Sequence, residues 1–414
     1  MKEDSVERLR APIAVAFEAS GISSQAPLVS VIVPFYNVAS YAERCLDSLV
    51  AQDFERYEVV CIDDGSTDGT GELLDRYEGA YPFVRVFHYE KSGLSIARNR
   101  GVALARAGLI TFVDGDDYVS PHYVRTLYEI HRGRAGRMVR VGFEPSYSVE
   151  QAESGPWGLF EESDAMRPTR SIEGVSAVRR SFLLGEFPHY AWGTLAERGL
   201  YEHIPFEPGV LFEDIYASAD LVPRLSEVVL VEAGLYGYTR RVGSICNPAE
   251  PDEQLLRDNL AAIRHFKGAV GEWGEELAAY APVKVAWLYS GLCARTLVFG
   301  ERVMWGTYLG EARRFVRENC GALLRAVRKG WLSPRVPCGP VAKAWLPQAW
   351  LAARGVRGWM ADLLAEFCRW PHVPLSGIRS LARPQPSHPP GRDRWYKRDN
   401  ALLSAWLRSQ EGLT

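Results

Sequence analysis

The sequence predicts an α/β fold whose N-terminal half is built on a mostly parallel central sheet. Over residues 29–128, short apolar runs rich in β-branched residues alternate with segments of helical periodicity, which is typical of βαβ units. The chain has 414 residues, of which 47% are hydrophobic and 24% charged. It is therefore expected to be globular and long enough for two or three structural units.

Four buried strands are expected in this half, because the runs are nearly continuous in apolar residues, as strands covered on both faces are. They span residues 29–35, 57–62, 84–89 and 109–113. The helices between them are expected at residues 41–50, 69–78 and 95–107. Pro121, at a position where a first helical turn tolerates proline, is expected to begin the next helix.

The pattern changes after residue 131. Residues 144–170 are rich in Gly, Pro, Ser and Glu, which predicts a long loop or insertion. A helix over residues 171–184 and strands over 228–232 and 235–240 are expected to follow. From residue 253 the periodicity is helical, and helices are predicted at residues 253–269, 275–299, 308–329, 341–351, 356–369 and 398–408.

The C-terminal part differs from the rest in charge. Residues 301–414 carry 19 Lys or Arg against 8 Asp or Glu and hold eight of the twelve Trp residues, although the whole chain has a net charge of −3. Such a basic, Trp-rich region is typical either of a helical domain that packs on an acidic partner or of a surface that contacts anionic lipid. The sequence leaves both interpretations open.

Several protein classes are excluded by missing patterns. No apolar run reaches the roughly 18 residues of a membrane span, and the charged first ten residues do not resemble a signal peptide. We therefore expect a cytoplasmic protein, with the inner face of the membrane as an alternative. The seven cysteines lack a C-x-x-C pair, and the eight histidines lack a zinc-binding spacing. The phosphate-binding motifs of dinucleotide-binding proteins and P-loop NTPases are absent, and no nucleic-acid-binding module accompanies the basic region.

Acidic turns follow two of the predicted strands. Residues 63–69 are Asp-Asp-Gly-Ser-Thr-Asp-Gly, and residues 114–117 are Asp-Gly-Asp-Asp. Because ligands of open α/β sheets bind at the carboxyl ends of the strands, we expect these carboxylates to lie close together. Hard oxygen ligands in a D-x-D turn suit Mg²⁺ or Mn²⁺ that bridges the phosphates of a nucleotide. The structural alternative for the first turn is the capping of a helix.

Four motifs in this order resemble the inverting family 2 glycosyltransferases, whose catalytic domain has the GT-A fold. The matching segments are residues 31–37 (VIVPFYN), 63–68 (DDGSTD), 93–101 (GLSIARNRG) and 114–117 (DGDD), with a weaker match to about residue 244. The resemblance implies an N-terminal extension over residues 1–27, a GT-A domain over 28–245 and a helical basic region over 246–414. Within the GT-A domain, residues 28–130 would bind the nucleotide-sugar and residues 131–245 the acceptor.

By this resemblance, Pro34, Tyr36 and Asp64 line the pocket for the base and the ribose of the donor. Asp114 and Asp116 form the D-x-D pair that holds the ribose and a metal ion, either Mg²⁺ or Mn²⁺. The Tyr36 ring could also stack on a nucleobase on physical grounds alone. Its structural alternative is a half-buried aromatic at a strand end.

The third motif could bind the phosphates of the donor. Gly93 can bring the backbone close to a ligand, and Ser95 can cap a helix whose positive N-terminus favours phosphate. Arg98, in the first turns of that helix, could reach a phosphate oxygen. The alternative for Arg98 is a salt bridge to one of the aspartate clusters.

The second half of the GT-A domain is expected to supply the acceptor site and the catalytic base. Glu213 and Asp214 begin a predicted helix. Asp214 resembles the family's base, which takes the proton of the attacking hydroxyl, and Glu213 would be its neighbour on the acceptor side. Helix capping is the alternative for the pair. Trp192 resembles the acceptor-site aromatic of the family, with core packing as the alternative, and His189 could contact the diphosphate.

Together these expectations describe a metal-dependent inverting glycosyltransferase. It would move a sugar from a nucleotide-diphosphate donor, expected to be a UDP-sugar, to a hydroxyl of a glycan or lipid-linked acceptor in cell-surface polysaccharide synthesis. The absence of a Q-x-x-R-W motif favours a non-processive enzyme. Two alternatives stay open: a catalytically silent sugar-binding or assembly protein of the same fold, and a sugar-nucleotide pyrophosphorylase.

Overall fold

The computed structural model describes residues 26–146, 169–239, 241, 244–245, 253–299 and 302–329. Contacts between residues divide the chain into two compact units. The first contains Met1–Ala249 and Arg257–Ala281, and the second contains Glu250–Leu256 and Pro282–Thr414. The N-terminal extension up to residue 25, most of the expected loop at 144–170 and the helices expected after residue 329 lie outside the described residues.

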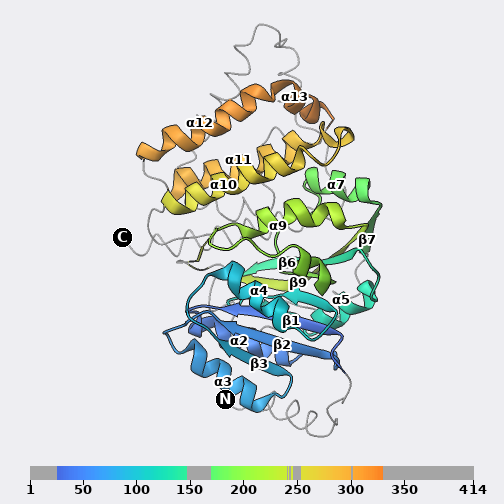
Figure 1. The fold of residues 1–414 in the computed structure, drawn as a ribbon, viewed down its shortest axis with the longest axis vertical. Helices are drawn as coiled ribbons and strands as arrows, with labels where there is room; N and C mark the ends of the chain where they lie inside the picture. Colours follow the sequence, from blue (N-terminus) through green and yellow to red (C-terminus); the bar gives the residue numbers. More distant parts are fainter. Residues whose placement is uncertain are drawn as a thin grey trace, which may run out of the picture. The chain divides into compact units, whose positions relative to one another are not determined.

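A nine-stranded sheet forms the centre of the first unit (Figure 1). Its strands are β1 (Val29–Phe35), β2 (Tyr57–Asp63), β3 (Val84–His88), β4 (Leu109–Phe112), β5 (Tyr118–Val119), β6 (Arg137–Ser146), β7 (Thr169–Glu173), β8 (Thr194–Glu197) and β9 (Glu227–Thr239). Their order is β3-β2-β1-β4-β8-β6-β9-β5, and β7 pairs with β9. The first four strands in this order are parallel, whereas β8 is antiparallel to β4 and β6. The predicted α/β fold with its parallel βαβ half is confirmed.

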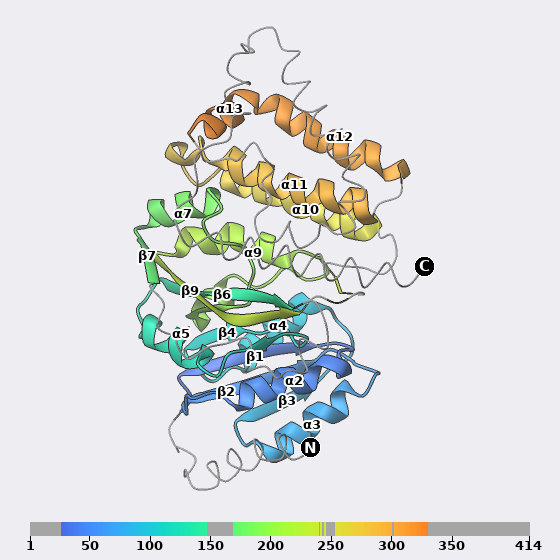
Figure 2. The same ribbon diagram turned by 180° about the vertical axis from the view of Figure 1, so that it is seen from behind.

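Helices connect these strands (Figures 1 and 2). In the first unit they are α2 (Ala39–Val50), α3 (Thr70–Ala80), α4 (Leu94–Leu104), α5 (Tyr123–His131), α7 (Val175–Leu183), α8 (Arg198–His203) and α9 (Glu213–Leu221), with short 3₁₀ turns at Val222–Arg224 and Glu275–Leu277. Helix α10 (Glu253–Val270) contributes to both units, and α11 (Ala281–Phe299), α12 (Arg302–Glu318) and α13 (Cys320–Arg328) follow. Among the described helices, none combines the length and the apolar character needed to cross a membrane.

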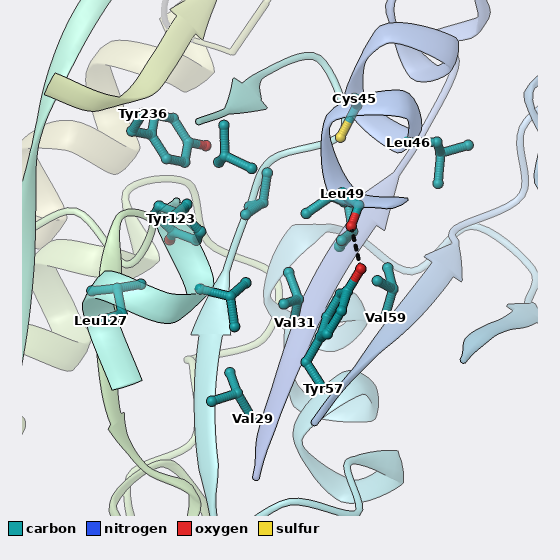
Figure 3. Close-up of a cluster of buried hydrophobic side chains, with 14 of the residues drawn as sticks. Val29, Val31, Cys45, Leu46, Leu49, Tyr57, Val59, Tyr123, Leu127 and Tyr236 are labelled. Atoms are coloured by element: carbon teal, nitrogen blue, oxygen red, sulfur yellow. Dashed lines mark hydrogen bonds between the residues drawn. The ribbon is translucent and has the colours of Figure 1, made fainter. Parts of the chain in front are cut away.

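The core of the first unit lies on both faces of the parallel strands, because successive strand residues point to opposite faces. On one face, Val59 of β2 packs in the same cluster as Leu49 of α2, and the Tyr57 hydroxyl donates to the Leu49 backbone oxygen at 2.7 Å (Figure 3). On the other face, Val60 packs with Ala97 of α4. The sheet is therefore held between helices, and its strand ends are fixed in place.

Strand β6 was not expected from the sequence, because arginines interrupt its apolar pattern. Arg137 and Arg140 are only 9% and 6% exposed. The Arg137 guanidinium pairs with the Glu227 carboxylate at 2.7 Å, and Arg140 donates to the Tyr190 backbone oxygen at 3.0 Å. These partners come from distant parts of the chain, so a local sequence pattern does not reveal that the arginines are buried.

Two other expectations in this region were wrong. Strand β9 is continuous where two strands were predicted, because exposed Glu232 and the small Gly234 break the apolar pattern near the point where the pairing with β6 shifts register. The helix predicted over 171–184 begins only at Val175. Residues before it form β7, which is stabilised by antiparallel pairing with β9 rather than by local preference.

Helix α4 packs closely on β1 at Gly101, which gives a first prediction. A Cβ added to Gly101 would lie 2.2 Å from Cγ2 of Ile32, whereas a Cβ added to Gly79 in α3 would contact nothing within 4 Å. Gly101→Ala should lower the free energy of unfolding by about 1–3 kcal/mol through overpacking. Gly79→Ala should leave it unchanged or raise it by up to about 1 kcal/mol. Urea denaturation measures both, and equal effects would contradict this packing.

His88 at the end of β3 links three elements and gives a pH-dependent prediction. Its Nδ1 lies 2.9 Å from Asp63 of β2, and its Nε2 lies 2.9 Å from Asp75 of α3. These hydrogen bonds raise the pKa of His88 above its ordinary value. The stabilisation from charged His88 is therefore complete below the unfolded pKa and is lost as the pH rises through the raised folded pKa.

We accordingly expect His88→Ala to destabilise the fold more at about pH 5.5 than at about pH 8.5. Asp75→Asn, which weakens one of the two contacts at an exposed position, should reduce this pH dependence without abolishing it. Denaturant titrations of the wild type and both variants at the two pH values test this. A loss of stability in His88→Ala that is independent of pH would assign His88 a packing role only.

Candidate active site

The carboxyl ends of β1, β2 and β4 bring the donor-side residues together, because these parallel strands are neighbours. Pro34 is buried at the end of β1. A Cβ added to Gly115 would lie 2.8 Å from the Pro34 backbone oxygen and 2.5 Å from the Phe35 ring. The D-x-D turn after β4 therefore rests directly on β1, and only glycine fits between its two aspartates.

Asp117 is fully buried, and its carboxylate is hydrogen-bonded within the protein. Its carboxylate accepts a hydrogen bond from the Tyr236 hydroxyl at 2.6 Å and another from the backbone N–H of Thr239 at 2.7 Å. The Tyr236 hydroxyl also accepts a hydrogen bond from the Asp114 backbone N–H at 3.1 Å. Burial, together with the charges of Asp116 and Asp114, raises the pKa of Asp117 well above its ordinary value. Asp117 thus joins the D-x-D turn to β9.

Asp116 pairs with an arginine that the sequence analysis did not single out. Nε of Arg241, just after β9, lies 2.7 Å from Oδ2 of Asp116. Burial and the charge of Asp114 raise the pKa of Asp116, and Arg241 acts in the opposite direction. Arg44 of α2 donates to the backbone oxygen of Asp116 at 3.1 Å.

Arg98 of α4 adopts the alternative considered for it, a salt bridge within the acidic cluster. Its side chain is 3% exposed, its Nη2 lies 2.7 Å from Oδ1 of Asp114, and its Nη1 pairs with Glu213. Burial alone would lower the pKa of Arg98, but Asp114 and Glu213 raise it. Arg98 thus forms a bridge between the D-x-D turn and α9. Glu213, 6% exposed, is engaged in this bridge.

Asp214 is the exposed member of the Glu213-Asp214 pair. It lies in the first turn of α9 with 19% of its side chain exposed, and its Oδ2 is 3.7 Å from Nε2 of His189. The preceding residue, Phe212, has φ 64° and ψ 37°, a left-handed conformation that is strained for a bulky side chain. This backbone turn directs Glu213 towards Arg98 and leaves Asp214 beside His189.

Trp192 lies in an aromatic stack that reaches the D-x-D turn. Its ring is stacked on Tyr190 at 4.7 Å, on Tyr236 at 4.5 Å and on Tyr238 at 5.5 Å between centroids. Because Tyr236 also bonds to the D-x-D turn, the expected acceptor-site aromatic and the expected metal turn share one side chain. Trp192 is half-buried, so it packs in this stack without being fully enclosed.

The donor-side loop contains one exposed ring and one buried carboxylate. Tyr36 is 39% exposed, and Nζ of Lys91 donates to its hydroxyl at 2.8 Å. Asp64 is 4% exposed and accepts hydrogen bonds from the backbone N–H groups of Ser92, at 2.9 Å, and Gly93, at 2.7 Å. The Asp64 carboxylate therefore holds the loop before α4 through the oxygens that were expected to face the nucleobase and ribose of the donor.

Helix α4 begins without a side-chain cap. Its N-cap residue is Gly93, at φ 96°, and Ser95 lies inside the helix, so the expected capping by Ser95 is wrong. The first amides of the helix have no partner within the helix, as at the N-terminus of any helix, and the Gly93 N–H just before them bonds to Asp64. Such an end favours an anion through both its N–H groups and its dipole.

The D-x-D turn fits a divalent cation that is shared with a substrate. Asp114 and Asp116 offer two hard carboxylates, 23% and 19% exposed, and Asp116 already holds a positive group in Arg241. Within the described residues, no group of three or more His, Cys, Asp or Glu side chains is arranged to hold a metal ion. Mg²⁺ usually binds through one or two carboxylates together with substrate phosphates, so the residues present suit such an ion.

Three contacts of the site were missed by sequence reasoning: Arg241 on Asp116, the Tyr236 hydroxyl on the D-x-D turn, and His189 beside Asp214. Each joins residues that are far apart in the chain. A lone arginine after a strand or a lone tyrosine within one carries no local signal of such a partner.

Comparison with known proteins identifies relatives. The family model of Glycosyl transferase family 2 matches residues 30–142. EpsJ of Bacillus subtilis (strain 168), described as an uncharacterized glycosyltransferase, is 32% identical over 262 residues, which are 61% of this chain and 74% of EpsJ. The glycosyltransferase GlyG of Streptococcus pneumoniae is 28% identical over 240 residues, which are 56% of this chain and 76% of GlyG.

Solved structures support the same assignment at the level of the fold. The crystal structure of S. aureus TarS 1–349 in complex with UDP aligns with a TM-score of 0.50 at 19% sequence identity, covering 73% of this chain and 87% of the TarS chain. The family itself is shown by the family model over residues 30–142 and by EpsJ, which is 32% identical over 74% of its length. The chain therefore belongs to glycosyltransferase family 2 and is a glycosyltransferase with a GT-A fold.

Proposed function

We propose that the chain is a metal-dependent inverting glycosyltransferase that transfers a sugar from a nucleotide-diphosphate donor to a hydroxyl of a glycan or lipid-linked acceptor. One observation carries this proposal: the buried Arg98 joins the D-x-D turn to the Glu213-Asp214 pair. The candidate metal ligand Asp114 and the pair that contains the candidate base are therefore held by the same arginine. A displacement at a sugar carbon needs the leaving diphosphate and the base to be held in this way.

The donor in this proposal is a UDP-sugar. The exposed Tyr36 ring offers a surface on which a base can stack, and the first-turn N–H groups of α4 that follow Gly93 can receive phosphate oxygens. Pro34 and Asp64 would hold the shape of this pocket, since both are buried and packed against neighbouring turns. The TarS structure that shares the fold contains UDP, which makes uridine nucleotides the first donors to test.

Asp114 and Asp116 would hold Mg²⁺ or Mn²⁺ together with the diphosphate. When bound, the ion neutralises the negative charge that develops on the leaving diphosphate. The chain's own residues keep the two carboxylates in position: Arg98 fixes Asp114, and Tyr236 and Asp117 tie the turn to β9.

Asp214 would act as the general base. The acceptor oxygen attacks the anomeric carbon while the bond from that carbon to the diphosphate breaks, and the hydroxyl proton passes to the Asp214 carboxylate. His189, 3.7 Å away, would orient this carboxylate. Because Glu213 is engaged by Arg98, the two members of the pair would have different roles: Glu213 positions α9 and Asp214 reacts.

The acceptor would approach over the stack of aromatic rings around Trp192, which is half-buried. The exposed side chains of Arg313, Arg314 and Arg317 on α12 support contact of the second unit with an anionic surface, such as lipid-linked acceptor or membrane headgroups. In this proposal the enzyme transfers one sugar per encounter with the acceptor. It does so in cell-surface polysaccharide synthesis.

Two substitutions are expected to separate donor binding from transfer. Asp116→Ala removes a ligand of the shared cation, so the Mn²⁺-dependent affinity for UDP should fall about tenfold or more. Asp214→Asn keeps the shape of the side chain but cannot accept the proton. It should leave the UDP affinity within about twofold of wild type while kcat falls by roughly 10²- to 10⁴-fold. Calorimetry with UDP and Mn²⁺ and a transfer assay, with the donor sugar chosen by a thermal-shift screen, measure these effects.

The matched control is Asp220→Asn, which removes an exposed carboxylate from the same helix and should change neither quantity. Wild-type kcat in Asp214→Asn would refute the base assignment. A chain that binds UDP-sugars with Mn²⁺ but neither transfers nor hydrolyses them would instead favour the catalytically silent alternative.

Tyr236→Phe is expected to weaken donor binding indirectly, through the D-x-D turn rather than through a contact of Tyr236 with the donor. It removes only the hydroxyl that bonds to the Asp114 N–H and to Asp117, so the D-x-D turn loses these two hydrogen bonds to β9 and keeps the one from the Thr239 N–H to Asp117. We expect the UDP affinity in Mn²⁺ to fall about three- to tenfold. Tyr123→Phe is the control, because its equally buried hydroxyl bonds to Thr111 instead. Similar losses of affinity in both variants would indicate general destabilisation rather than positioning of the turn.

A further inference from the structure

We propose that Arg241 is an internal counterion that occupies the cation position of Asp116 until the donor arrives, and that it then transfers to the donor's diphosphate. This inference rests on the proposed function, because it requires the D-x-D turn to bind a divalent cation together with a nucleotide diphosphate. It gives Arg241 a role in coupling the two binding events.

The position of Arg241 differs from that of the other arginine in the cluster. Its Nε lies 2.7 Å from Oδ2 of Asp116, and the two side chains are 21% and 19% exposed. Arg98 is 3% exposed and is bound to two carboxylates. A ligand that enters from solvent can therefore reach Arg241, whereas Arg98 is enclosed by the protein.

Arg241 and a divalent cation would repel each other if both were bound to the Asp116 carboxylate. A metal ion on the Asp116 carboxylate would lie within a few ångströms of the guanidinium, and like charges at that distance repel each other even when water partly screens them. Binding of the cation must therefore displace Arg241 from the carboxylate or be weakened by it.

The donor offers Arg241 a better partner. A nucleoside diphosphate held by the cation at the D-x-D turn brings phosphate oxygens to the same place, and the planar guanidinium matches such oxygens with two parallel hydrogen bonds. The metal alone brings no anion to replace Asp116. Cation and donor should consequently bind cooperatively, each raising the affinity of the other by the same factor.

The turn can keep its shape when Arg241 leaves, because a second arginine holds its backbone. Nη2 of Arg44 donates to the backbone oxygen of Asp116 at 3.1 Å and to Oγ1 of Thr239 at 2.5 Å. Its guanidinium also lies over the Tyr118 ring, 4.4 Å from the centroid. Arg44 thus supports the shape of the turn, and Arg241 compensates the charge of its carboxylate.

Arg241→Gln tests the proposal through two affinities that should move in opposite directions. Without nucleotide, Mn²⁺ should bind roughly three- to tenfold more tightly, because the competing charge is gone. At saturating Mn²⁺, UDP should bind about tenfold more weakly, because a charge-assisted contact to the diphosphate is lost. Electron paramagnetic resonance of free Mn²⁺ and calorimetry with UDP measure these on the full chain.

Two controls separate charge from shape. Arg241→Lys keeps the positive charge and should leave the nucleotide-free Mn²⁺ affinity within about twofold of wild type. Arg44→Gln removes a charge that bonds to the backbone of the same turn rather than to its carboxylate, so it should lower the Mn²⁺ affinity or leave it unchanged.

An Arg241→Gln chain whose Mn²⁺ affinity is unchanged or weaker would overturn the inference, since the ion pair would then serve only the shape of the site. In that case UDP binding by the wild type would leave the proposed function standing. A wild-type chain that binds no nucleoside diphosphate with Mn²⁺ or Mg²⁺ would overturn both.

Discussion

The site depends on the compensation of negative charge at the carboxyl ends of buried strands. Asp114, Asp116 and Asp117 occupy one short turn, and Arg98 links that turn to Glu213 at the start of α9. Carboxylates so close to one another would raise each other's pKa and take up protons unless cations or hydrogen-bond donors held the charge. The structure supplies Arg98, Arg241 and the Tyr236 hydroxyl for this purpose, and their placement determines which carboxylates stay available to a ligand.

In each of the two pairs of adjacent acidic residues, one carboxylate is bonded inside the protein and the other remains partly exposed to a ligand. Asp117 is enclosed and bonded to β9, while Asp116 is partly exposed beside Arg241. Glu213 is enclosed and bonded to Arg98, while Asp214 is partly exposed beside His189. The enclosed member fixes the local backbone, and the exposed member is left where chemistry can occur. This division explains why adjacent acidic residues in one motif need not have the same role.

The sequence predicts well what depends on local patterns and poorly what depends on distant partners. Strands β1 to β4 and the helices between them follow from continuous apolar runs and helical periodicity, so their positions were predicted closely. Strand β6 was missed because the partners that allow Arg137 and Arg140 to be buried come from β9 and from Tyr190. In the site, the motifs located the aspartates, but the partner of Asp116 could not be inferred because Arg241 is 125 residues away.

The motif-bearing segment does not contain all the residues that contact the D-x-D turn and Arg98. The family match ends at residue 142, whereas Glu213, Tyr236 and Arg241 lie beyond it. Without them, Arg98 would keep only one of its two carboxylate partners, and buried Asp117 would lose the hydrogen bond from Tyr236. Loss of such partners from buried polar and charged groups is destabilising, because the groups that remain have fewer hydrogen bonds to replace those with water. The D-x-D turn therefore depends for its observed contacts on β9 and on Arg241 just after it.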